Sequence, residues 1–539
     1  MADALTRQAA RDAGTVLQLG FDGTSAPDWV LRALSAGQLG GVVLFSRNIV
    51  EREQVAALCA QVYAANPEAL ISIDEEGGDV TRLEFREGSS YPGNYALGRV
   101  DDVSLTEAVG RSIGRDLAEL GIGYDYAPCA DVNANPDNPV IGVRSFGAES
   151  ELVARHTAAY IRGLQSQGVV ACAKHFPGHG DTAGDSHTGL PLIEYDEASE
   201  LLHLAPFRSA IEAGTRSIMT AHVLVPRHDG ELPATMSRKI LTGLLRERLG
   251  FQGLIVTDGI DMGAISARYG VAEGTVRAIE AGVDALLWGG SHCDEDSYLH
   301  LRDALVWALR EGRLSPERLN EAAERCRAAA RWSTQARAAA AGSAAEGLAV
   351  DRAVGLEAAR RALGVRGEVK PFAAPAHVVE FSPVVSIAVD TATPWGLAEP
   401  LRALVPETTS TRIEAPMKHV ENVGLMVSRI VDQDAVLDVS AELAAAVGRP
   451  LVLAVRDLHR NPWMRRAVDA VRAERADALV VEFGLPHGED ADLYTYGASR
   501  VSGIAAAQYL TGRYPAGAVQ YPSGGTTTAG TPNESKGSH

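Results

Sequence analysis

Residues 168–187 read Gly-Val-Val-Ala-Cys-Ala-Lys-His-Phe-Pro-Gly-His-Gly-Asp-Thr-Ala-Gly-Asp-Ser-His. The stretch opens as an apolar run, typical of a buried strand, and passes at Lys174 into a glycine-rich segment with three histidines and two aspartates. Titratable side chains on the loop after a strand are where α/β enzymes carry their chemistry. The stretch therefore predicts an α/β fold and the position of an active site within it.

Further apolar runs of the same kind recur through the first 335 residues, and amphipathic stretches such as 51–64 and 152–167 lie between several of them. Buried strands that alternate with helices predict a TIM-like (β/α)₈ barrel. A doubly wound open sheet is the alternative, but it normally has fewer strands. The eight predicted strands cover 16–21, 41–45, 70–74, 124–128, 170–175, 217–222, 254–258 and 285–289.

The chain has 539 residues, too many for one hydrophobic core. Residues 311–365 are rich in alanine and arginine and predict helices, after which a second α/β pattern begins. Its apolar runs at 384–389, 423–427, 451–455 and 478–483 predict an open parallel sheet with no nucleotide-binding motif. We expect a barrel over 1–335, a helical linker over 336–365, a second α/β domain over 366–525 and a flexible tail over 526–539.

Composition excludes several classes of function. With 46% apolar and 22% charged residues, the chain has the composition of a globular protein. A net charge of −19 argues against a nucleic acid or an anionic membrane as a partner.

The five cysteines are scattered without a CxxC pair, which favours reduced thiols over disulfides or a zinc site. The N-terminus has no apolar signal region, so the expected localisation is cytoplasmic. The oligomeric state is not indicated.

Asp258 follows the apolar run 254–257 and precedes Gly259. A carboxylate at the C-terminal end of a barrel strand reaches a bound substrate from a rigid support. The alternative is an N-cap aspartate for the next helix. Asp261, three residues on, suits the cap better, so the cap does not require Asp258, and the local sequence leaves both roles open for it.

Asp185 and His187 lie two residues apart on the glycine-rich loop. A carboxylate that accepts a hydrogen bond from one ring nitrogen leaves the other nitrogen to exchange a proton with substrate. One alternative is a solvated loop without function. Another is a metal site, but the three histidines lack helical spacing and no cysteine joins them, so we expect no metal.

Polar residues end four of the predicted barrel strands, and in a barrel these ends converge. Lys174 and His175 should reach the pocket mouth, where cationic and donor groups suit a ligand rich in hydroxyls. Asp74 is an acceptor for such hydroxyls, and His222 ends a strand in the same way. Arg82 and Arg144 carry no strong local signal.

Four segments together resemble glycoside hydrolase family 3, in its β-N-acetylglucosaminidase branch. They are the 174–187 stretch, Ile73-Asp-Glu-Glu-Gly-Gly, Val140-Ile-Gly-Val-Arg-Ser-Phe and Val256-Thr-Asp-Gly-Ile-Asp-Met. The resemblance covers the whole barrel in the right order, and the second domain resembles, more weakly, the αβα sandwich of the family. It implies no cofactor.

The resemblance also implies the roles of individual residues. Asp258 would be the nucleophile that forms a covalent glycosyl-enzyme, and His187, held by Asp185, would be the general acid/base. Asp74, Arg82, Arg144, Lys174 and His175 would bind the sugar. The expected reaction is the retaining removal of a terminal non-reducing N-acetylglucosamine from peptidoglycan fragments or chitooligosaccharides.

A histidine acid/base departs from the usual pair of carboxylates. Its unperturbed pKa is about 6.5, and it is neutral after giving up its proton. An anionic acceptor then meets less repulsion, so a phosphorylase that uses phosphate in place of water is an alternative within the same chemistry. An inactive carbohydrate-binding protein is an alternative from another class, and a metal-dependent hydrolase is a third.

Overall fold

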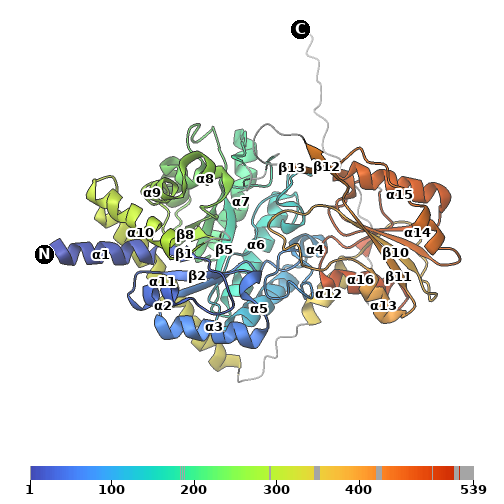
Figure 1. Ribbon diagram of the computed structural model, residues 1–539, viewed down its shortest axis with the longest axis horizontal. Helices are drawn as coiled ribbons and strands as arrows, with labels where there is room; N and C mark the ends of the chain where they lie inside the picture. The colour runs from blue at the N-terminus through green and yellow to red at the C-terminus, as the bar shows by residue number, and fades with distance from the viewer. Residues whose placement is uncertain are drawn as a thin grey trace, which may run out of the picture. The chain divides into compact units, whose positions relative to one another are not determined.

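The computed structural model describes residues 2–182, 184, 186, 189–289, 293–344, 353–420, 428–488, 490–514 and 521–522. The chain divides into two compact units, and neither is continuous in sequence (Figure 1). The first unit consists of Met1–Ala359, Val384–Gly396 and Tyr496–Ile504. The second consists of Arg360–Pro383, Leu397–Thr495 and Ala505–His539.

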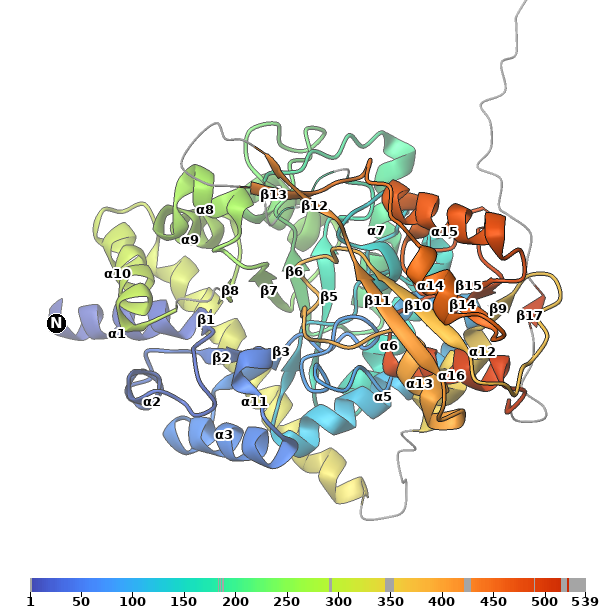
Figure 2. The same cartoon turned by 45° about the vertical axis from the view of Figure 1, so that its right-hand side comes forward.

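The first unit is built on an eight-stranded parallel sheet, and Figure 2 shows its strands in the middle with helices around them. An isolated parallel bridge between Val256 and Ala285 joins the two outermost strands, so the sheet curls into a barrel. The predicted TIM-like barrel is confirmed. Its strands are β1 (Leu17–Leu19), β2 (Gly41–Leu44), β3 (Leu70–Ile73), β4 (Tyr124–Asp125), β5 (Val170–Phe176), β6 (Ser217–Thr220), β7 (Leu254–Thr257) and β8 (Leu286–Trp288).

Helices connect these strands in the right order for a barrel, and the two predicted amphipathic stretches form α3 and α6. The π-helix Lys239–Arg248 lies between β6 and β7. The α-helices of this part of the chain are α1 (Ala2–Thr15), α2 (Asp28–Ser35), α3 (Arg52–Ala65), α4 (Asn94–Val100), α5 (Val103–Leu120), α6 (Ser150–Gln165), α7 (Glu197–Glu212), α8 (Gly263–Tyr269), α9 (Val271–Ala281), α10 (Glu295–Arg310) and α11 (Pro316–Ala344).

The long helix α11 closes the N-terminal end of the barrel. The Ser333 hydroxyl lies within hydrogen-bond distance of the carbonyl oxygens of Gly123 (2.9 Å) and Gly168 (2.8 Å), which precede β4 and β5. Gly168 has a φ of +78°, and a Cβ there would lie 2.2 Å from the backbone nitrogen of Arg337. Because the helix approaches this closely, the C-terminal ends of the strands are left as the place for a site.

The second unit contains a seven-stranded sheet that is parallel except for the antiparallel pairing of β16 with β9. Figure 1 shows α14 (Ser440–Ala445) and α15 (Pro462–Glu474) on one face and α13 (Ala398–Leu404) on the other, which confirms the αβα sandwich. The sheet order is β11 (Thr409–Glu414), β10 (His377–Ser382), β14 (Leu451–Val455), β15 (Leu479–Glu482), β16 (Leu493–Tyr494), β9 (Gly364–Val365) and β17 (Tyr521–Pro522).

The remaining elements are a strand pair and two helices. Strands β12 (Met417–Val420) and β13 (Ser428–Val431) pair antiparallel outside the large sheets. Helix α12 (Ala353–Ala362) lies in the predicted linker, and α16 (Arg500–Leu510) spans the last boundary between the units. In the described part of the chain, no helix is both long and apolar enough to cross a lipid bilayer.

The prediction of a strand at 384–389 is wrong. The strand is β10, which ends at Ser382, and two of the apolar residues that follow it are largely exposed: Val384 by 65% and Ile387 by 68%. They belong to the first unit and not to the second domain in whose sequence they lie. The predicted strand at 423–427 and the predicted tail at 526–539 lie outside the described residues.

Asp284 ties the base of the barrel together. It is fully buried, forms ion pairs with Arg246, Arg318 (2.8 Å) and Arg325 (3.1 Å), and accepts a hydrogen bond from the backbone nitrogen of Ile255. Removing one partner from a buried ionic cluster leaves the other charges uncompensated.

We therefore expect Asp284→Ala to lower the free energy of unfolding by about 3–5 kcal/mol. Urea denaturation measures the loss. The matched control is Asp303→Ala, because Asp303 pairs with Arg302 at a position where its own side chain is 63% exposed, and exposed pairs contribute little. Equal losses for both variants would contradict this role of Asp284.

Candidate active site

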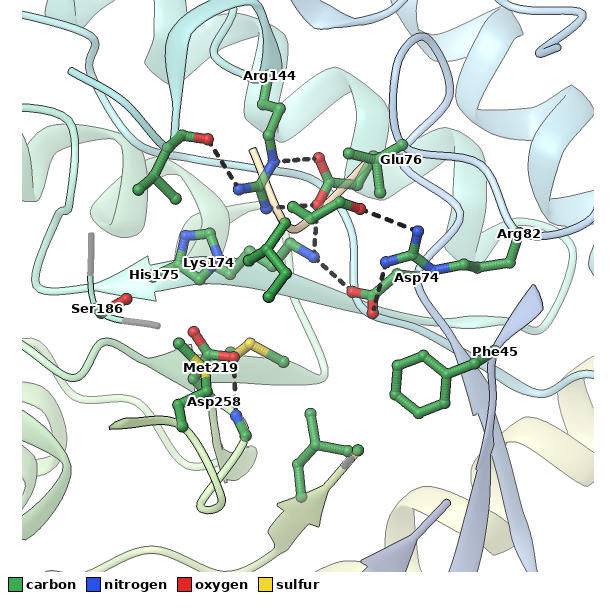
Figure 3. A pocket seen from close by; sticks show the side chains of 18 of the residues that line it. Phe45, Asp74, Glu76, Arg82, Arg144, Lys174, His175, Ser186, Met219 and Asp258 are labelled. Atoms are coloured by element: carbon green, nitrogen blue, oxygen red, sulfur yellow. Dashed lines mark hydrogen bonds and ion pairs between the residues drawn. The ribbon is translucent and has the colours of Figure 1, made fainter. Parts of the chain in front are cut away.

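A cavity of about 370 Å³ opens at the C-terminal ends of the barrel strands. Its volume lies near the lower end of the roughly 300–1,000 Å³ typical of ligand pockets. Residues from the ends of β2, β3, β5, β7 and β8 contribute to its wall. The structure brings together there six of the predicted site residues, shown in Figure 3: Asp74, Arg82, Arg144, Lys174 and His175 among the binding candidates, and Asp258 as the candidate nucleophile.

A continuous network of charges forms one side of this cavity (Figure 3). The Lys174 Nζ lies 2.8 Å from Asp74 Oδ1 and 2.6 Å from Glu76 Oε1. Arg144 binds both oxygens of Glu76 in a bidentate pair, at 2.8 and 3.0 Å. At the other end, Arg82 Nη2 lies 3.8 Å from Asp74 Oδ2. Three cations therefore share two carboxylates, an arrangement that presents fixed donors and acceptors to the hydroxyls of a ligand.

Burial and charge act in opposite directions on this network. Burial alone raises the pKa of Glu76, but Arg144 and Lys174 outweigh it and hold that pKa well below its usual range. Burial alone lowers the pKa of Lys174, but Asp74 and Glu76 raise it above its usual value. Both groups are therefore charged at neutral pH, and each depends on its partners to be so.

Lys174 and His175 both line the cavity although they are consecutive in β5. In a regular strand, neighbouring side chains point to opposite faces. The pairing of β5 with β6 shifts register between Ala173 and Phe176, as in a β-bulge. A bulge redirects side chains and is common beside active sites, and the irregularity falls at Lys174 and His175.

His175 is oriented by a buried carboxylate that the sequence analysis did not identify. Its Nδ1 lies 2.7 Å from Asp131 Oδ2, and Asp131 also accepts hydrogen bonds from the backbone nitrogens of His175 and His179. Burial raises the pKa of Asp131, but the nearby His175 and His179 lower it by more than burial raises it. The net shift of this pKa is therefore downward. An ionised carboxylate only accepts, so Nδ1 carries the hydrogen and Nε2 is the ring nitrogen available to a ligand.

Cys129, Asp131 and His175 place one ligand atom each within 4.8 Å of one another, the geometry of a possible metal site. However, the Cys129 Sγ lies 3.2 Å from Asp131 Oδ2, as a thiol donor does. Burial and the charge of Asp131 raise the pKa of this thiol well above its usual value. In this arrangement the Cys129 thiol donates to Asp131, and Asp131 in turn accepts from His175, so the three residues form a hydrogen-bonded support for the His175 ring.

Asp258 follows β7 directly and is anchored through its own backbone and the next residue. Its backbone nitrogen donates to the Thr220 carbonyl at 3.2 Å, and its Oδ1 accepts from the Gly259 nitrogen at 2.8 Å. In Figure 3 its carboxylate lies across the cavity from Lys174 and Asp74.

The structure corrects the prediction that His222 binds substrate. This side chain is fully buried and does not line the cavity. Its Nδ1 lies 2.7 Å from Thr235 Oγ1, and its Nε2 lies 2.9 Å from the Gly259 carbonyl, to which it donates. Because it donates to the carbonyl of the residue that follows Asp258, His222 positions the turn that carries the candidate nucleophile.

Asp261 does not cap a helix as the sequence suggested. Helix α8 begins at Gly263 with Met262 at the N-cap and without a side-chain cap. Asp261 Oδ1 instead accepts a hydrogen bond from the Gly289 nitrogen at 3.2 Å, which ties the turn after β7 to the end of β8. Burial raises the pKa of its carboxyl group.

The predicted acid/base pair, Asp185 and His187, lies outside the described residues. Ser186, the residue between them, lines the cavity, and its hydroxyl lies 3.0 Å from His179 Nε2. Burial and the neighbouring His175 lower the pKa of His179 to about 4, so the ring is neutral at pH 7. The contact with Ser186 is therefore a hydrogen bond between uncharged groups on the wall of the cavity.

Sequence reasoning missed three contributors to this site. Glu76 was quoted in the segment Ile73-Asp-Glu-Glu-Gly-Gly, and its place two residues after Asp74 was a usable signal. Asp131 follows the short strand β4 by a few residues, so the position of this strand was the available clue. Residues 387–390 carried no such signal, because they lie about a hundred residues beyond the last barrel strand.

Glu76 and Glu75 provide a test of the charge network, because both are buried but, among the residues that the structure describes, only Glu76 pairs with cations. We expect Glu76→Gln to lower the free energy of unfolding by about 3–5 kcal/mol, since it leaves buried positive charge uncompensated. Burial raises the pKa of Glu75 to about 7, and its Oε2 accepts hydrogen bonds from two backbone nitrogens.

Glu75→Gln is therefore the matched control, and at pH 6 it should cost much less, because the amide keeps an acceptor and the native carboxyl is mostly protonated. Urea denaturation of both variants at pH 6 makes the comparison. A Glu75→Gln variant as unstable as Glu76→Gln would show that burial, and not the pairing with Arg144 and Lys174, determines the loss.

Comparisons with known proteins agree with this geometry. The model of the glycosyl hydrolase family 3 N-terminal domain matches residues 17–329. A beta-hexosaminidase A of Pseudoalteromonas piscicida is 36% identical over 328 residues, which cover 56% of this chain and 55% of that protein, so the chain spans about half of that relative's length. A beta-hexosaminidase of Thiobacillus denitrificans is 35% identical over 281 residues, 50% of this chain and 77% of the relative.

A solved structure gives the most extensive match among these comparisons. The glycoside hydrolase family 3 beta-N-acetylglucosaminidase from Paenibacillus sp. str. FPU-7 is 32% identical, with a TM-score of 0.78, and the match covers 94% of this chain and 97% of that one. The match to the family model extends over more than half of the chain and takes in every strand of the barrel. This chain therefore belongs to glycosyl hydrolase family 3, a family of glycoside hydrolases.

Proposed function

We propose that this protein is a retaining exo-β-N-acetylglucosaminidase, which removes a terminal non-reducing N-acetylglucosamine. The observation that carries the proposal is the placement of Asp258 at the end of a barrel strand, facing the network of Lys174, Asp74 and Glu76 across a small cavity. A sugar fits this arrangement, because its anomeric carbon can contact the Asp258 carboxylate while its hydroxyls contact the charged donors and acceptors on the opposite side. The names of the relatives support the choice of sugar.

The reaction follows in two steps. An Asp258 oxygen attacks the anomeric carbon while the glycosidic C–O bond breaks, and the imidazolium of His187 gives its proton to the departing oxygen. The product of this step is a glycosyl ester of Asp258. A water then attacks the same carbon, His187 takes the proton of the water, and the ester bond breaks to release the sugar with its original configuration.

The other carboxyl groups of the cavity have different tasks. Arg144 and Lys174 hold the pKa of Glu76 well below its usual range, which makes Glu76 a poor acid, and Asp74 is engaged in an ion pair with Lys174. Asp261 is the rival for the acid role, because burial raises its pKa. Its oxygen is held by the Gly289 nitrogen, however, and it follows Asp258 by only three residues on the same turn. We therefore propose His187, supported by Asp185, as the acid/base.

The cavity volume also favours a single sugar ring in the deep part of the site. A volume near the low end of the range for ligand pockets suits one monosaccharide unit and not an internal segment of a polysaccharide. We propose as substrates small N-acetylglucosamine-terminated peptidoglycan fragments or chitooligosaccharides. The expected cytoplasmic localisation stays a prediction.

The acid role of His187 is tested with a series of leaving groups. His187→Ala should slow hydrolysis of chitobiose by roughly 10²–10⁴-fold, because a sugar alkoxide needs a proton to depart. It should slow release of 2,4-dinitrophenolate from the corresponding aryl glycoside far less. The matched variant is Asp261→Asn, which should show no such dependence on the leaving group. A dependence seen with Asp261→Asn and not with His187→Ala would transfer the role to Asp261.

The acceptor is tested by identifying the products from chitobiose with and without inorganic phosphate. We expect free N-acetylglucosamine under both conditions, released first as the β-anomer in a proton NMR time course. Accumulation of N-acetylglucosamine 1-phosphate in proportion to phosphate would identify a phosphorylase instead. Initial release of the α-anomer of the free sugar would contradict the retaining mechanism.

A further inference from the structure

The segment Val384–Gly396 forms part of the cavity wall although it lies in the chain between β10 and α13. It belongs to the first compact unit together with the barrel. Two backbone hydrogen bonds shape it into consecutive tight turns: Val389 N donates to Ser386 O, and Thr393 N donates to Asp390 O, both at 3.0 Å. Three of its residues line the cavity: Ile387, Ala388 and Asp390.

Arg82 fixes the segment to the charge network. Its Nη1 donates to the Ala388 carbonyl at 2.9 Å, while its Nη2 lies 3.8 Å from Asp74 Oδ2. The segment therefore joins the network at the Arg82–Asp74 end, and this attachment places Asp390, two residues further on, at the same cavity.

Only one oxygen of the Asp390 carboxylate is engaged by a hydrogen bond within the described residues. Its Oδ1 accepts a hydrogen bond from the Ala392 nitrogen at 2.8 Å, which fixes the carboxylate in the turn. Within the described residues it forms no ion pair, and its Oδ2 accepts no hydrogen bond. Asp74 and Glu76, by contrast, are each paired with cations. Asp390 thus offers the cavity a charged acceptor that a hydroxyl of the ligand can satisfy.

The orientation of a bound sugar indicates which hydroxyl this is. In Figure 3, Asp258 and Ser186 lie on one side of the cavity, and Asp74 and Arg82 lie on the other. The anomeric carbon must contact Asp258. In a pyranose ring, C4 lies opposite C1 and C6 branches from C5, so the 4- and 6-hydroxyls point to the Arg82 end.

We propose that Asp390 is a substrate-binding residue that accepts a hydrogen bond from the 4- or 6-hydroxyl of the terminal sugar. The inference rests on the proposed function and extends it, because it assigns selectivity for a free hydroxyl at the non-reducing end to a segment outside the barrel sequence. Sugars substituted at that hydroxyl are then poor substrates, since they leave the carboxylate without its donor.

This role is tested by a double-mutant-type cycle, in which one protein variant is combined with substrate analogues that lack single hydroxyls. The substrates are 4-nitrophenyl β-N-acetylglucosaminide and its 4-deoxy and 6-deoxy analogues, and the variant is Asp390→Asn, which keeps an oxygen for the Ala392 nitrogen. We expect Asp390→Asn to lower kcat/KM for the parent substrate on the order of tenfold or more, as for loss of a hydrogen bond to a charged group. For the analogue that lacks the contacted hydroxyl, the change should be less than about twofold, since no such bond remains to be lost. Asp303→Asn removes the same charge from an exposed site and is the control.

Each outcome has one reading. Losses that are equal for all three substrates, or no loss for any, would overturn the role of Asp390 while leaving the proposed function intact. A wild-type enzyme that does not cleave the parent substrate would refute the proposed function and, with it, this inference. A loss confined to substrates that carry one particular hydroxyl supports the contact and identifies its position.

Discussion

The buried carboxylate of Glu76 is the interaction on which the geometry of the site depends. It receives Lys174 from β5 and a bidentate Arg144 from the loop after β4, and so joins strand β5 and the loops after β3 and β4 at the open end of the barrel. Each of these groups would be costly to bury alone, but together they remain charged because the partners offset the loss of solvent. This network also places Asp74 and Arg82, because Lys174 forms an ion pair with Asp74 and Asp74 in turn attracts Arg82.

In the proposed reaction, this network binds the sugar and Asp258 carries out the chemistry. The strand ends on one side of the cavity carry ion pairs, while on the other side the Asp258 backbone nitrogen donates to the Thr220 carbonyl and its Oδ1 accepts from the Gly259 nitrogen. His222 supports that turn from behind by donating to the Gly259 carbonyl. A rigid charge array facing a carboxylate at a strand end is a suitable arrangement for a reaction in which one carbon must approach one oxygen closely.

The sequence was sufficient for the barrel, because eight buried runs separated by amphipathic stretches leave few other folds, and polar residues such as Asp74 and Asp258 mark strand ends directly. The sequence was insufficient where tertiary contacts determine the position of a segment or the partner of a side chain. Residues 384–389 form an apolar run like that of a strand, but Arg82 donates to the Ala388 carbonyl at the cavity, and no local sequence signal indicates this contact. His222 and Asp261 have the right positions in sequence, yet their side chains are taken up by Gly259 and Gly289. Asp131 could be identified only once the fold placed it beneath His175.

The central claim is that Asp258 forms a covalent bond with the sugar. It is tested most directly by trapping the intermediate with a 5-fluoro glycosyl fluoride of N-acetylglucosamine and locating the adduct by mass spectrometry of the digested protein. The account predicts one N-acetyl-5-fluorohexosamine residue on the peptide that contains Asp258, and none in an Asp258→Ala variant. An adduct on a different peptide, or inactivation by this reagent without any adduct, would contradict it.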